Sequence, residues 1–180
     1  MNYAAIKNCD IANGPGVRVS LFVSGCTHRC KGCFNQVAWD FNYGEPFTHE
    51  TVQHILDMLS APYIQGLTLL GGEPFEPANQ AALLPLLQAV KKQYPGKTIW
   101  AYSGYLFDRD IMAGHLGDAE ITKEILKCLD VLVDGPFVEE KKDLTLRFRG
   151  SSNQRLIDVP KSLACGQAIA WEDWQGNERG

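Results

Sequence analysis

The stretch VRVSLFVSGCTHRCKGC, residues 17–33, joins a predicted strand to a loop with three closely spaced cysteines. Residues 17–23 are β-branched or apolar at most positions, which favours a β-strand. A Ser-Gly pair follows, and the loop then carries Cys26, Cys30 and Cys33. Three thiolates from one loop can converge on a single centre, and iron–sulfur clusters are held by cysteine thiolates. The stretch therefore predicts a metal centre at the carboxyl end of a strand.

The rest of the chain alternates further strands with helices. Apolar runs bounded by turn residues predict strands at 66–70, 97–102, 130–133 and 155–159. Apolar residues at helical spacing predict helices at 51–59 behind the N-cap Thr48, at 78–94, and at 119–128. Pro85 should begin or kink the second helix. This order favours an α/β fold, and we expect a partial (open) β/α barrel of about four to six mostly parallel strands with outer helices. The motifs should meet at the carboxyl edge of its sheet.

Size and composition indicate one ordinary domain. The chain has 180 residues, and we expect a single domain over 1–180 with a polar tail from about residue 172. The formal charge of -4 lacks the basic excess that is typical of nucleic-acid-binding surfaces. No apolar stretch reaches the roughly 18 residues that cross a bilayer, and residues 1–15 lack the apolar core of a signal peptide. We therefore expect a cytoplasmic protein that binds neither nucleic acid nor membrane.

The cysteine content leaves a disulfide framework and a zinc site as alternatives to a cluster. Small secreted domains use disulfides because they lack a core, whereas this chain is long enough to form one. Structural zinc prefers a second ligand pair at longer spacing, and the sequence offers only His28 inside the loop. A cluster with one iron left open is the favoured interpretation. We expect the remaining cysteines to be small buried side chains, namely Cys9, Cys128 and Cys165.

Two other motifs lie next to predicted strands. The sequence GGEP at 71–74 follows the strand at 66–70. Its glycines permit a close approach of the backbone to a ligand, and its carboxylate can accept hydrogen bonds from an ammonium group. Taken alone, GGEP is more often an ordinary turn. The sequence NGPGVR at 13–18 precedes the first strand, and taken alone it is typical of a turn with an exposed arginine.

In combination, the cysteine loop and the GGE sequence resemble the signature of the radical S-adenosylmethionine superfamily. The resemblance implies a 4Fe-4S cluster held by Cys26, Cys30 and Cys33, which would also be the catalytic residues. It implies that the open iron chelates the cosubstrate S-adenosylmethionine and that reduction releases a 5′-deoxyadenosyl radical. It further implies that the GGE sequence binds the amino group of the cosubstrate.

Within this superfamily the chain is similar to the activases of glycyl radical enzymes, and most of all to those of anaerobic ribonucleotide reductase. NGPGVR resembles the DGPG[IV]R element of such activases, with Asn13 in place of Asp. The other matching sequences are FN at 34–35, SGY at 103–105, DGPF at 134–137 and GSSNQR at 150–155. The resemblance runs from about residue 8 to residue 163. One departure is Gly32, because many relatives have an aromatic residue just before the third cysteine.

The resemblance implies a protein partner and a set of cofactor contacts. The partner is the catalytic subunit of anaerobic ribonucleoside-triphosphate reductase, which would lose a hydrogen atom from one glycine Cα, and a flavodoxin-type protein would donate electrons. The implied cofactor-binding residues are Gly32, Cys33, Phe34, Asn35, Gly71, Gly72, Glu73, Pro74, Ser103 and Asp134. Ser103, Asp134 and Tyr105 lie at strand ends and could equally be turn residues.

Some polar and aromatic residues receive less specific predictions. Gln154 and Arg155 either receive the glycine loop of the partner or are solvated. The three histidines outside the cysteine loop lack partners at ligand spacing, so we expect capping or surface roles for His49, His54 and His115. Trp171 and Trp174 either pack on the domain or meet a partner.

Three alternative functions stay open. One is an activase for another glycyl radical enzyme, such as pyruvate formate-lyase. A second is a radical enzyme with a small-molecule substrate, of the 7-carboxy-7-deazaguanine synthase type. The third belongs to a different class, a zinc-stabilised binding module without catalysis. Metal content and the colour of anaerobically purified protein separate the third from the others.

Overall fold

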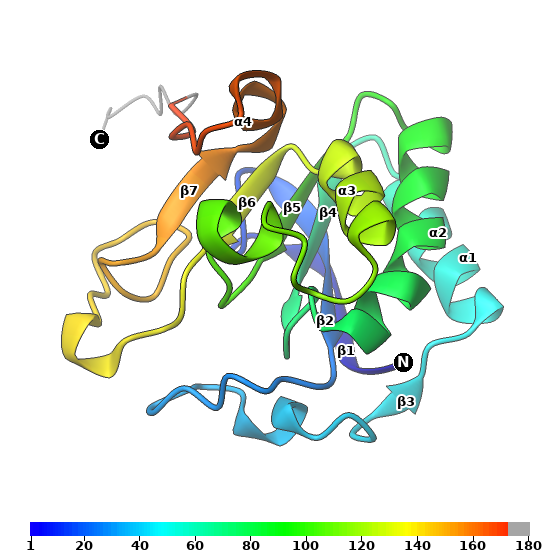
Figure 1. Cartoon of the computed structure of the whole chain (residues 1–180). Helices are drawn as coiled ribbons and strands as arrows, with labels where there is room; N and C mark the ends of the chain where they lie inside the picture. Colours follow the sequence, from blue (N-terminus) through cyan, green and yellow to red (C-terminus); the bar gives the residue numbers. More distant parts are fainter. Residues whose placement is uncertain (173–180) are drawn as a thin grey trace, which may run out of the picture.

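The computed structural model describes residues 1–172 of the chain, which form one open seven-stranded sheet with helices (Figure 1). The strand order is β3-β1-β2-β4-β5-β6-β7. The four inner strands are parallel to one another, and their bounds are β2 Val17–Val23, β4 Ile64–Gly71, β5 Thr98–Tyr102 and β6 Val131–Asp134. The outer strands pair antiparallel, and their bounds are β1 Asn2–Asp10, β3 Glu45–Pro46 and β7 Arg155–Asp158.

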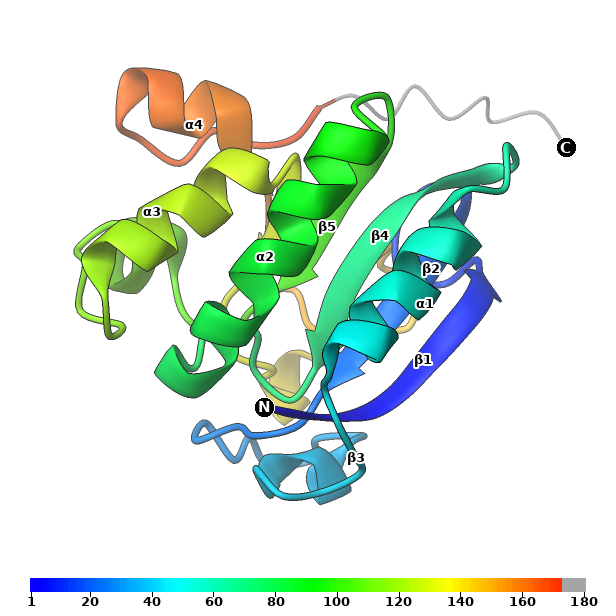
Figure 2. The same cartoon turned by 90° about the vertical axis from the view of Figure 1, so that its right-hand side faces the viewer.

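The longer helices gather on one face of this sheet. Figure 2 shows α1, α2 and α3 in front of the strands, with α4 following β7 at the far end. Their bounds are α1 His49–Leu59, α2 Pro77–Gln93, α3 Ala119–Cys128 and α4 Val159–Cys165. Short helical turns occur at η1 Gln36–Trp39, η2 Phe107–Ile111 and η3 Glu139–Lys141. No helix within residues 1–172 is long and apolar enough to cross a membrane.

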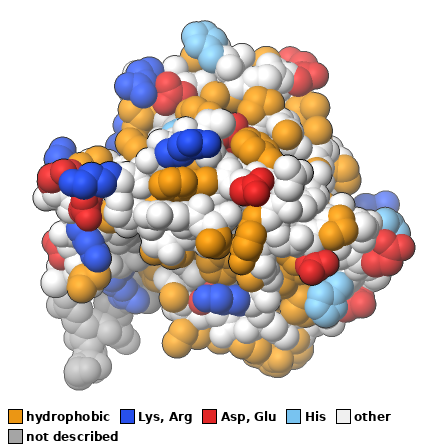
Figure 3. Space-filling model, turned by 90° about the horizontal axis from the view of Figure 1, so that it is seen from below, with side chains coloured by type: hydrophobic (Ala, Val, Ile, Leu, Met, Phe, Trp, Pro, Cys, Tyr) orange, Lys and Arg blue, Asp and Glu red, His pale blue; other side chains and the backbone are white. Residues whose placement is uncertain are grey.

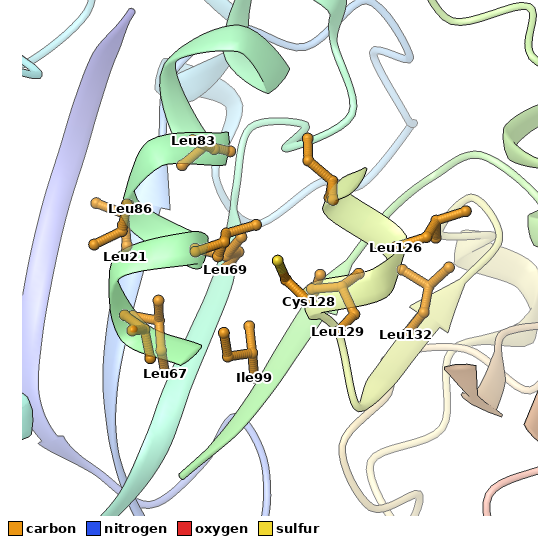
Figure 4. Close-up of a cluster of buried hydrophobic side chains, with 14 of the residues drawn as sticks. Leu21, Leu67, Leu69, Leu83, Leu86, Ile99, Leu126, Cys128, Leu129 and Leu132 are labelled. Atoms are coloured by element: carbon orange, nitrogen blue, oxygen red, sulfur yellow. The ribbon is translucent and has the colours of Figure 1, made fainter. Parts of the chain in front are cut away.

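Side-chain alternation along the inner strands gives the sheet two different faces. One set of positions packs against the helices in the main core, where Leu21 of β2, Leu69 of β4 and Ile99 of β5 meet Leu83 and Leu86 of α2 (Figure 4). The intervening positions point to the face without long helices. On that face lie Arg18, Ser20, Thr68, Leu70, Trp100, Tyr102, Val131 and Val133.

The helix-free face holds a buried arginine, whereas the NGPGVR sequence taken alone is typical of an exposed one. Arg18 is fully buried, and all five of its N–H donors are used within the protein. The acceptors are Thr68 Oγ1, Pro15 O, Thr98 Oγ1, Leu67 O and Thr98 O. Burial lowers the pKa of Arg18 to about 10, so the guanidinium is still charged at neutral pH. Thr68 links Arg18 to the segment before β2, because its hydroxyl accepts from Arg18 and donates to Asn13 O over 2.8 Å.

The strand count corrects the prediction of about four to six strands. β1 and β3 were not predicted, because their side chains are exposed or only partly buried and show no apolar alternation. β7 was predicted, but it pairs antiparallel with β6 at the edge of the sheet. α2 begins at Pro77 and contains Pro85 in its interior, so the alternative in which Pro85 begins the helix is wrong. α4 was also missed, since it has only seven residues.

The isolated cysteines and the tryptophans have different outcomes. Cys128 is buried as predicted, but Cys9 and Cys165 are exposed, which corrects the prediction for those two. Trp171 packs edge-on against Trp100, with ring centroids 5.0 Å apart. Trp174 and all but the first residue of the predicted polar tail lie outside the described residues.

Candidate active site

A cleft of about 450 Å³ opens on the helix-free face, at the carboxyl ends of the inner strands. Nine of the predicted site residues line it: Cys26, Cys30, Gly32, Cys33, Phe34, Gly71, Gly72, Glu73 and Ser103. They come from three segments that follow β2, β4 and β5, as expected for ligand sites in open α/β sheets. The opposite wall comes from residues 142–150, which the sequence did not assign to the site.

The cysteine loop continues β2 and folds back on the segment after it. Gly25 N–H donates to Ala38 O, and Cys26 N–H donates to Trp39 O, so the loop begins in a fixed backbone frame. Gly25 has a φ of 98°, and a Cβ there would overlap the Phe41 ring, which is why glycine is needed before the first cysteine. A turn with Cys33 N–H donating to Cys30 O brings the second and third cysteines together.

The three loop thiols are free and have the chemistry of iron–sulfur ligands. Burial raises the pKa of Cys26 to about 11, and burial followed by the neighbouring Cys33 raises the pKa of Cys30. Such thiols become thiolates when a metal centre binds, because the centre supplies the missing positive charge. The backbone N–H of Asn35 also points to Cys33 Sγ at 3.4 Å, which is the kind of contact that tunes a cluster ligand. The residues present therefore fit a cluster held by three cysteines.

The thiols are not arranged around one metal-ion position. Across residues 1–172, no group of three or more His, Cys, Asp or Glu side chains could hold a single ion. His28, which could have completed a Cys₃His zinc set, has its Nε2 atom 2.9 Å from a Glu73 oxygen instead. The pKa of His28 is raised, because the hydrogen bond and charge of Glu73 outweigh the opposing effect of burial.

Glu73 is a buried carboxylate with four partners. It is 1% exposed, and its Oε1 atom accepts hydrogen bonds from Phe75 N–H at 2.8 Å and from the Ser103 hydroxyl at 2.9 Å. Its Oε2 atom accepts from Gly104 N–H at 2.7 Å and contacts His28. This carboxylate ties the segments after β2, β4 and β5 together, which is more than the sequence predicted of it.

The two glycines before Glu73 allow the backbone to pack on the cysteine loop. Gly72 N–H donates to Val23 O and Glu73 N–H donates to Gly25 O, at 2.7 and 2.8 Å. A Cβ on Gly72 would lie 2.5 Å from Gly25 O, and Gly71 has a φ of 107°. The sequence predicted close approach of this backbone to a ligand. Both glycines line the cleft, and they also pack against the backbone of β2 and of the cysteine loop.

A second carboxylate holds the cysteine loop in place, and the sequence did not point to it. Glu76 Oε1 accepts hydrogen bonds from the backbone N–H and the hydroxyl of Thr27, at 2.7 and 2.6 Å. The Tyr105 ring packs edge-on against the His28 ring, 4.3 Å away. The one signal in the sequence was that Glu76 follows Glu73 at helical spacing, and it becomes the residue before α2.

Of the other residues that the sequence singled out, Asn35, Pro74, Asp134 and Arg155 lie outside the cleft lining, and Gln154 lies in it. Asp134 is fully buried, and its carboxylate accepts from Phe107 N–H at 2.8 Å and pairs with Arg155. Arg155 also bonds Asp108, so it is not simply solvated. Pro74 is buried in the turn after Glu73. Asn35 caps η1. Gln154 does line the cleft, and it bonds Gly150, Ser151 and Gly135.

Comparison with known proteins agrees with this site. A family model described as a 4Fe-4S single cluster domain matches residues 12–157. The anaerobic ribonucleoside-triphosphate reductase-activating protein of Enterobacteria phage T4 is 44% identical over 156 residues, covering 87% of this chain and 93% of that protein. The chain belongs to this activating-protein family.

Other members of the family are similarly close. The Haemophilus influenzae member is 44% identical over 159 residues, covering 86% of this chain and 96% of that protein. The Escherichia coli K12 member is 43% identical over 156 residues, with the same coverage. Membership of the activating-protein family confirms the resemblance that the cysteine loop, GGE and NGPGVR motifs predicted.

Proposed function

We propose that this protein is the activating enzyme of an anaerobic ribonucleoside-triphosphate reductase, in which it installs a glycyl radical. The observation that carries the proposal is the meeting of three free thiols and Glu73 on one cleft, in a chain 44% identical to activating proteins over most of both lengths. A reduced cluster bound there would supply the electron that breaks a sulfonium carbon–sulfur bond of S-adenosylmethionine. The 5′-deoxyadenosyl radical released would take one hydrogen atom from a glycine Cα of the reductase.

The residues of the chain have distinct parts in this proposal. Cys26, Cys30 and Cys33 hold the cluster from the loop after β2. Glu73 binds the amino group of the cosubstrate, helped by Ser103, whose hydroxyl bonds the same carboxylate. Gly32 and Phe34 complete the cosubstrate pocket on the loop side, and Gly71 and Gly72 shape its opposite side. Asn35 and Pro74 lie outside the cleft lining and support these segments. We keep Asp134 as a structural support of this pocket through its pair with Arg155.

The lining of the cleft supports radical chemistry. Its floor is the helix-free face of the sheet, where Leu70 and Tyr102 lie on adjacent strands, and Phe148 covers it from the opposite wall. No acid or base is needed for hydrogen-atom transfer. Most of the wall area is apolar, although polar residues also line the cleft, among them Asn13, His28, Glu73, Lys142, Asp143 and Arg149. Apolar walls protect a reactive intermediate from side reactions with water.

Several finer assignments belong to the same proposal. We infer a flavodoxin-type electron donor and a cytoplasmic location, because activation of a protein partner by a reduced cluster requires a reducing compartment. We further infer that residues 1–180 act as one domain and that the sheet curves as a partial barrel around the cleft. The catalytic subunit of the reductase is the partner.

The deciding experiment is electron paramagnetic resonance of the reductase after anaerobic incubation with this protein, S-adenosylmethionine and a strong reductant. A glycyl-type doublet that is lost in Cys30→Ala is the expected result. Formation of 5′-deoxyadenosine without a doublet would assign the radical chemistry to another substrate, such as another glycyl radical enzyme or a small molecule. Colourless protein that binds zinc and forms no 5′-deoxyadenosine would support the binding module instead.

A further inference from the structure

Tyr102 lines the cleft and carries a buried hydroxyl group without a hydrogen-bond partner among the described residues. It is the last residue of β5, and it points to the helix-free face while the next residue, Ser103, bonds Glu73. A buried hydroxyl without a partner destabilises a fold, so its retention calls for a ligand that completes it.

The polar groups around Tyr102 are already committed to other partners. Arg18 lies close enough for its charge to act on the pKa of the phenol, but each of its five N–H donors has an acceptor elsewhere. Asn13, on the same cleft, donates from Nδ2 to Asp10 at 2.6 Å and accepts at its carbonyl from Thr68. The other two buried side-chain atoms without partners in the described chain belong to Ser24 and Asn153, and neither residue lines the cleft.

The rim of the cleft indicates what kind of molecule reaches Tyr102. Phe34 on the cysteine loop is 84% exposed, and Leu144 on the opposite wall is 88% exposed, the two highest values among the large hydrophobic residues described. Both line the cleft. Figure 3 shows hydrophobic side chains beside a mixed group of charges on the underside of the molecule. Next to the second cysteine of the loop, Lys31 pairs with Glu139 and Glu140. Exposed apolar side chains around a site mark contact with another macromolecule.

A glycine-bearing segment has to be recognised through its backbone. Glycine offers no side chain, and a peptide that enters an apolar cleft loses the water bonded to its amide groups. Each buried carbonyl then needs a donor from the protein. Burial raises the pKa of the Tyr102 phenol, which keeps the O–H proton in place for donation.

We propose that the Tyr102 hydroxyl donates a hydrogen bond to a backbone carbonyl of the glycine-bearing segment of the reductase, which enters the cleft between Phe34 and Leu144. This inference rests on the proposed function and adds a residue that positions the protein substrate. Tyr102 is separate from the residues assigned to the cluster and to the cosubstrate.

The test compares Tyr102→Phe with wild type and with Tyr63→Phe, an exposed tyrosine outside the cleft lining that serves as the matched control. Glycyl-radical formation is followed at increasing reductase concentrations under anaerobic conditions. We expect the KM for the reductase to rise about threefold to tenfold in Tyr102→Phe, as for loss of one hydrogen bond. Iron content and the Kd for S-adenosylmethionine should equal those of wild type. The thermal midpoint should be equal or higher, because phenylalanine removes a buried unpaired hydroxyl.

Each contrary result overturns the inference. An unchanged KM for the reductase excludes the hydrogen bond, and a weaker Kd for S-adenosylmethionine assigns the hydroxyl to the cosubstrate. A lower thermal midpoint with a parallel loss of iron assigns Tyr102 a structural role. The wild-type sample reports on the proposed function separately. If it forms 5′-deoxyadenosine but no glycyl radical, the choice of reductase is wrong and the inference is rejected with it; a normal wild-type signal with an unaltered variant rejects the inference alone.

Discussion

His28 Nε2 lies 2.9 Å from Glu73 Oε2, so a residue between two of the proposed cluster ligands is bonded directly to the proposed cosubstrate ligand. The same carboxylate accepts from Ser103 and from Gly104 N–H, at the end of β5. The cluster loop and the cosubstrate pocket are thus one connected hydrogen-bond network. This network fixes the position of the cysteine loop relative to the end of β5.

Replacing Cys30 with alanine should abolish cluster binding, because two thiolates from one loop cannot replace three. We expect anaerobically reconstituted Cys30→Ala to retain less than about a tenth of the wild-type iron, measured by iron analysis and visible absorbance. Cys165→Ala is the matched control, since that thiol is exposed at the end of α4. Wild-type iron content and radical yield in Cys30→Ala would contradict the ligand assignment.

Replacing Glu73 with glutamine should weaken S-adenosylmethionine binding while leaving iron in place. The amide lacks the negative charge that attracts an ammonium group, and its NH₂ group replaces one of the two oxygens that accept hydrogen bonds. We expect the Kd to rise at least about tenfold, because a hydrogen bond to a charged group is worth about 1.5–3 kcal/mol. Equilibrium dialysis of the reconstituted protein measures this. Glu140→Gln, an exposed residue, is the control, and an unchanged Kd for Glu73→Gln would show that GGEP is a structural turn only.

Replacing Gly72 with alanine should damage the cysteine loop without touching a thiol. The added Cβ would lie 2.5 Å from Gly25 O and 2.9 Å from Ala38 O, and both are backbone atoms that cannot move alone. We expect a loss of about 1–3 kcal/mol in the free energy of unfolding, measured by urea denaturation, together with lower iron retention. Gly96→Ala is the control, because a Cβ added at Gly96 would have no neighbouring atom within 4 Å. Equal stability of the two variants would contradict this packing argument.

The sequence predicted the centre of the fold well because the inner strands and longer helices carry strong local signals. The helix-facing residues of β2, β4 and β5 are apolar, and α1 has both an N-cap and apolar residues at helical spacing. β1 lacks such a signal, since it is stabilised by pairing with β2 and β3 and not by a buried face of its own. The sequence therefore did not predict β1, and only its pairing with β2 and β3 in the structure identifies it as a strand.

The site was predictable where it depends on strand ends and not where it depends on distant partners. The cysteines and Glu73 follow parallel strands, and the rule that such ends share an edge brought them together. The bond between Thr27 and Glu76 spans 49 residues, and the wall at 142–150 carries no motif that marks it. Taken alone, the NGPGVR sequence is typical of a turn with an exposed arginine, and only the long-range acceptors of Arg18 explain its burial.

Replacing Arg18 with methionine should loosen the segment that precedes β2. Methionine keeps much of the volume but leaves Thr68 Oγ1 and the carbonyls of Leu67 and Thr98 without their donor. We expect a loss of at least about 2 kcal/mol in the free energy of unfolding, because buried acceptors without partners cost about 1–3 kcal/mol each. Faster hydrogen exchange should appear at residues 11–16, whose position depends on the bond from Thr68 to Asn13 O.

A matched control separates this effect from the loss of any arginine. Arg109→Met removes a guanidinium that is 73% exposed and bonded to Asp110 at the surface, where ion pairs contribute little. Its free energy of unfolding should change by less than about 0.5 kcal/mol, with unchanged exchange at residues 11–16. If Arg18→Met behaves in the same way, the donors of Arg18 do not fix this segment, and the bonds of Asn13 to Thr68 and Asp10 are enough to place it on the cleft.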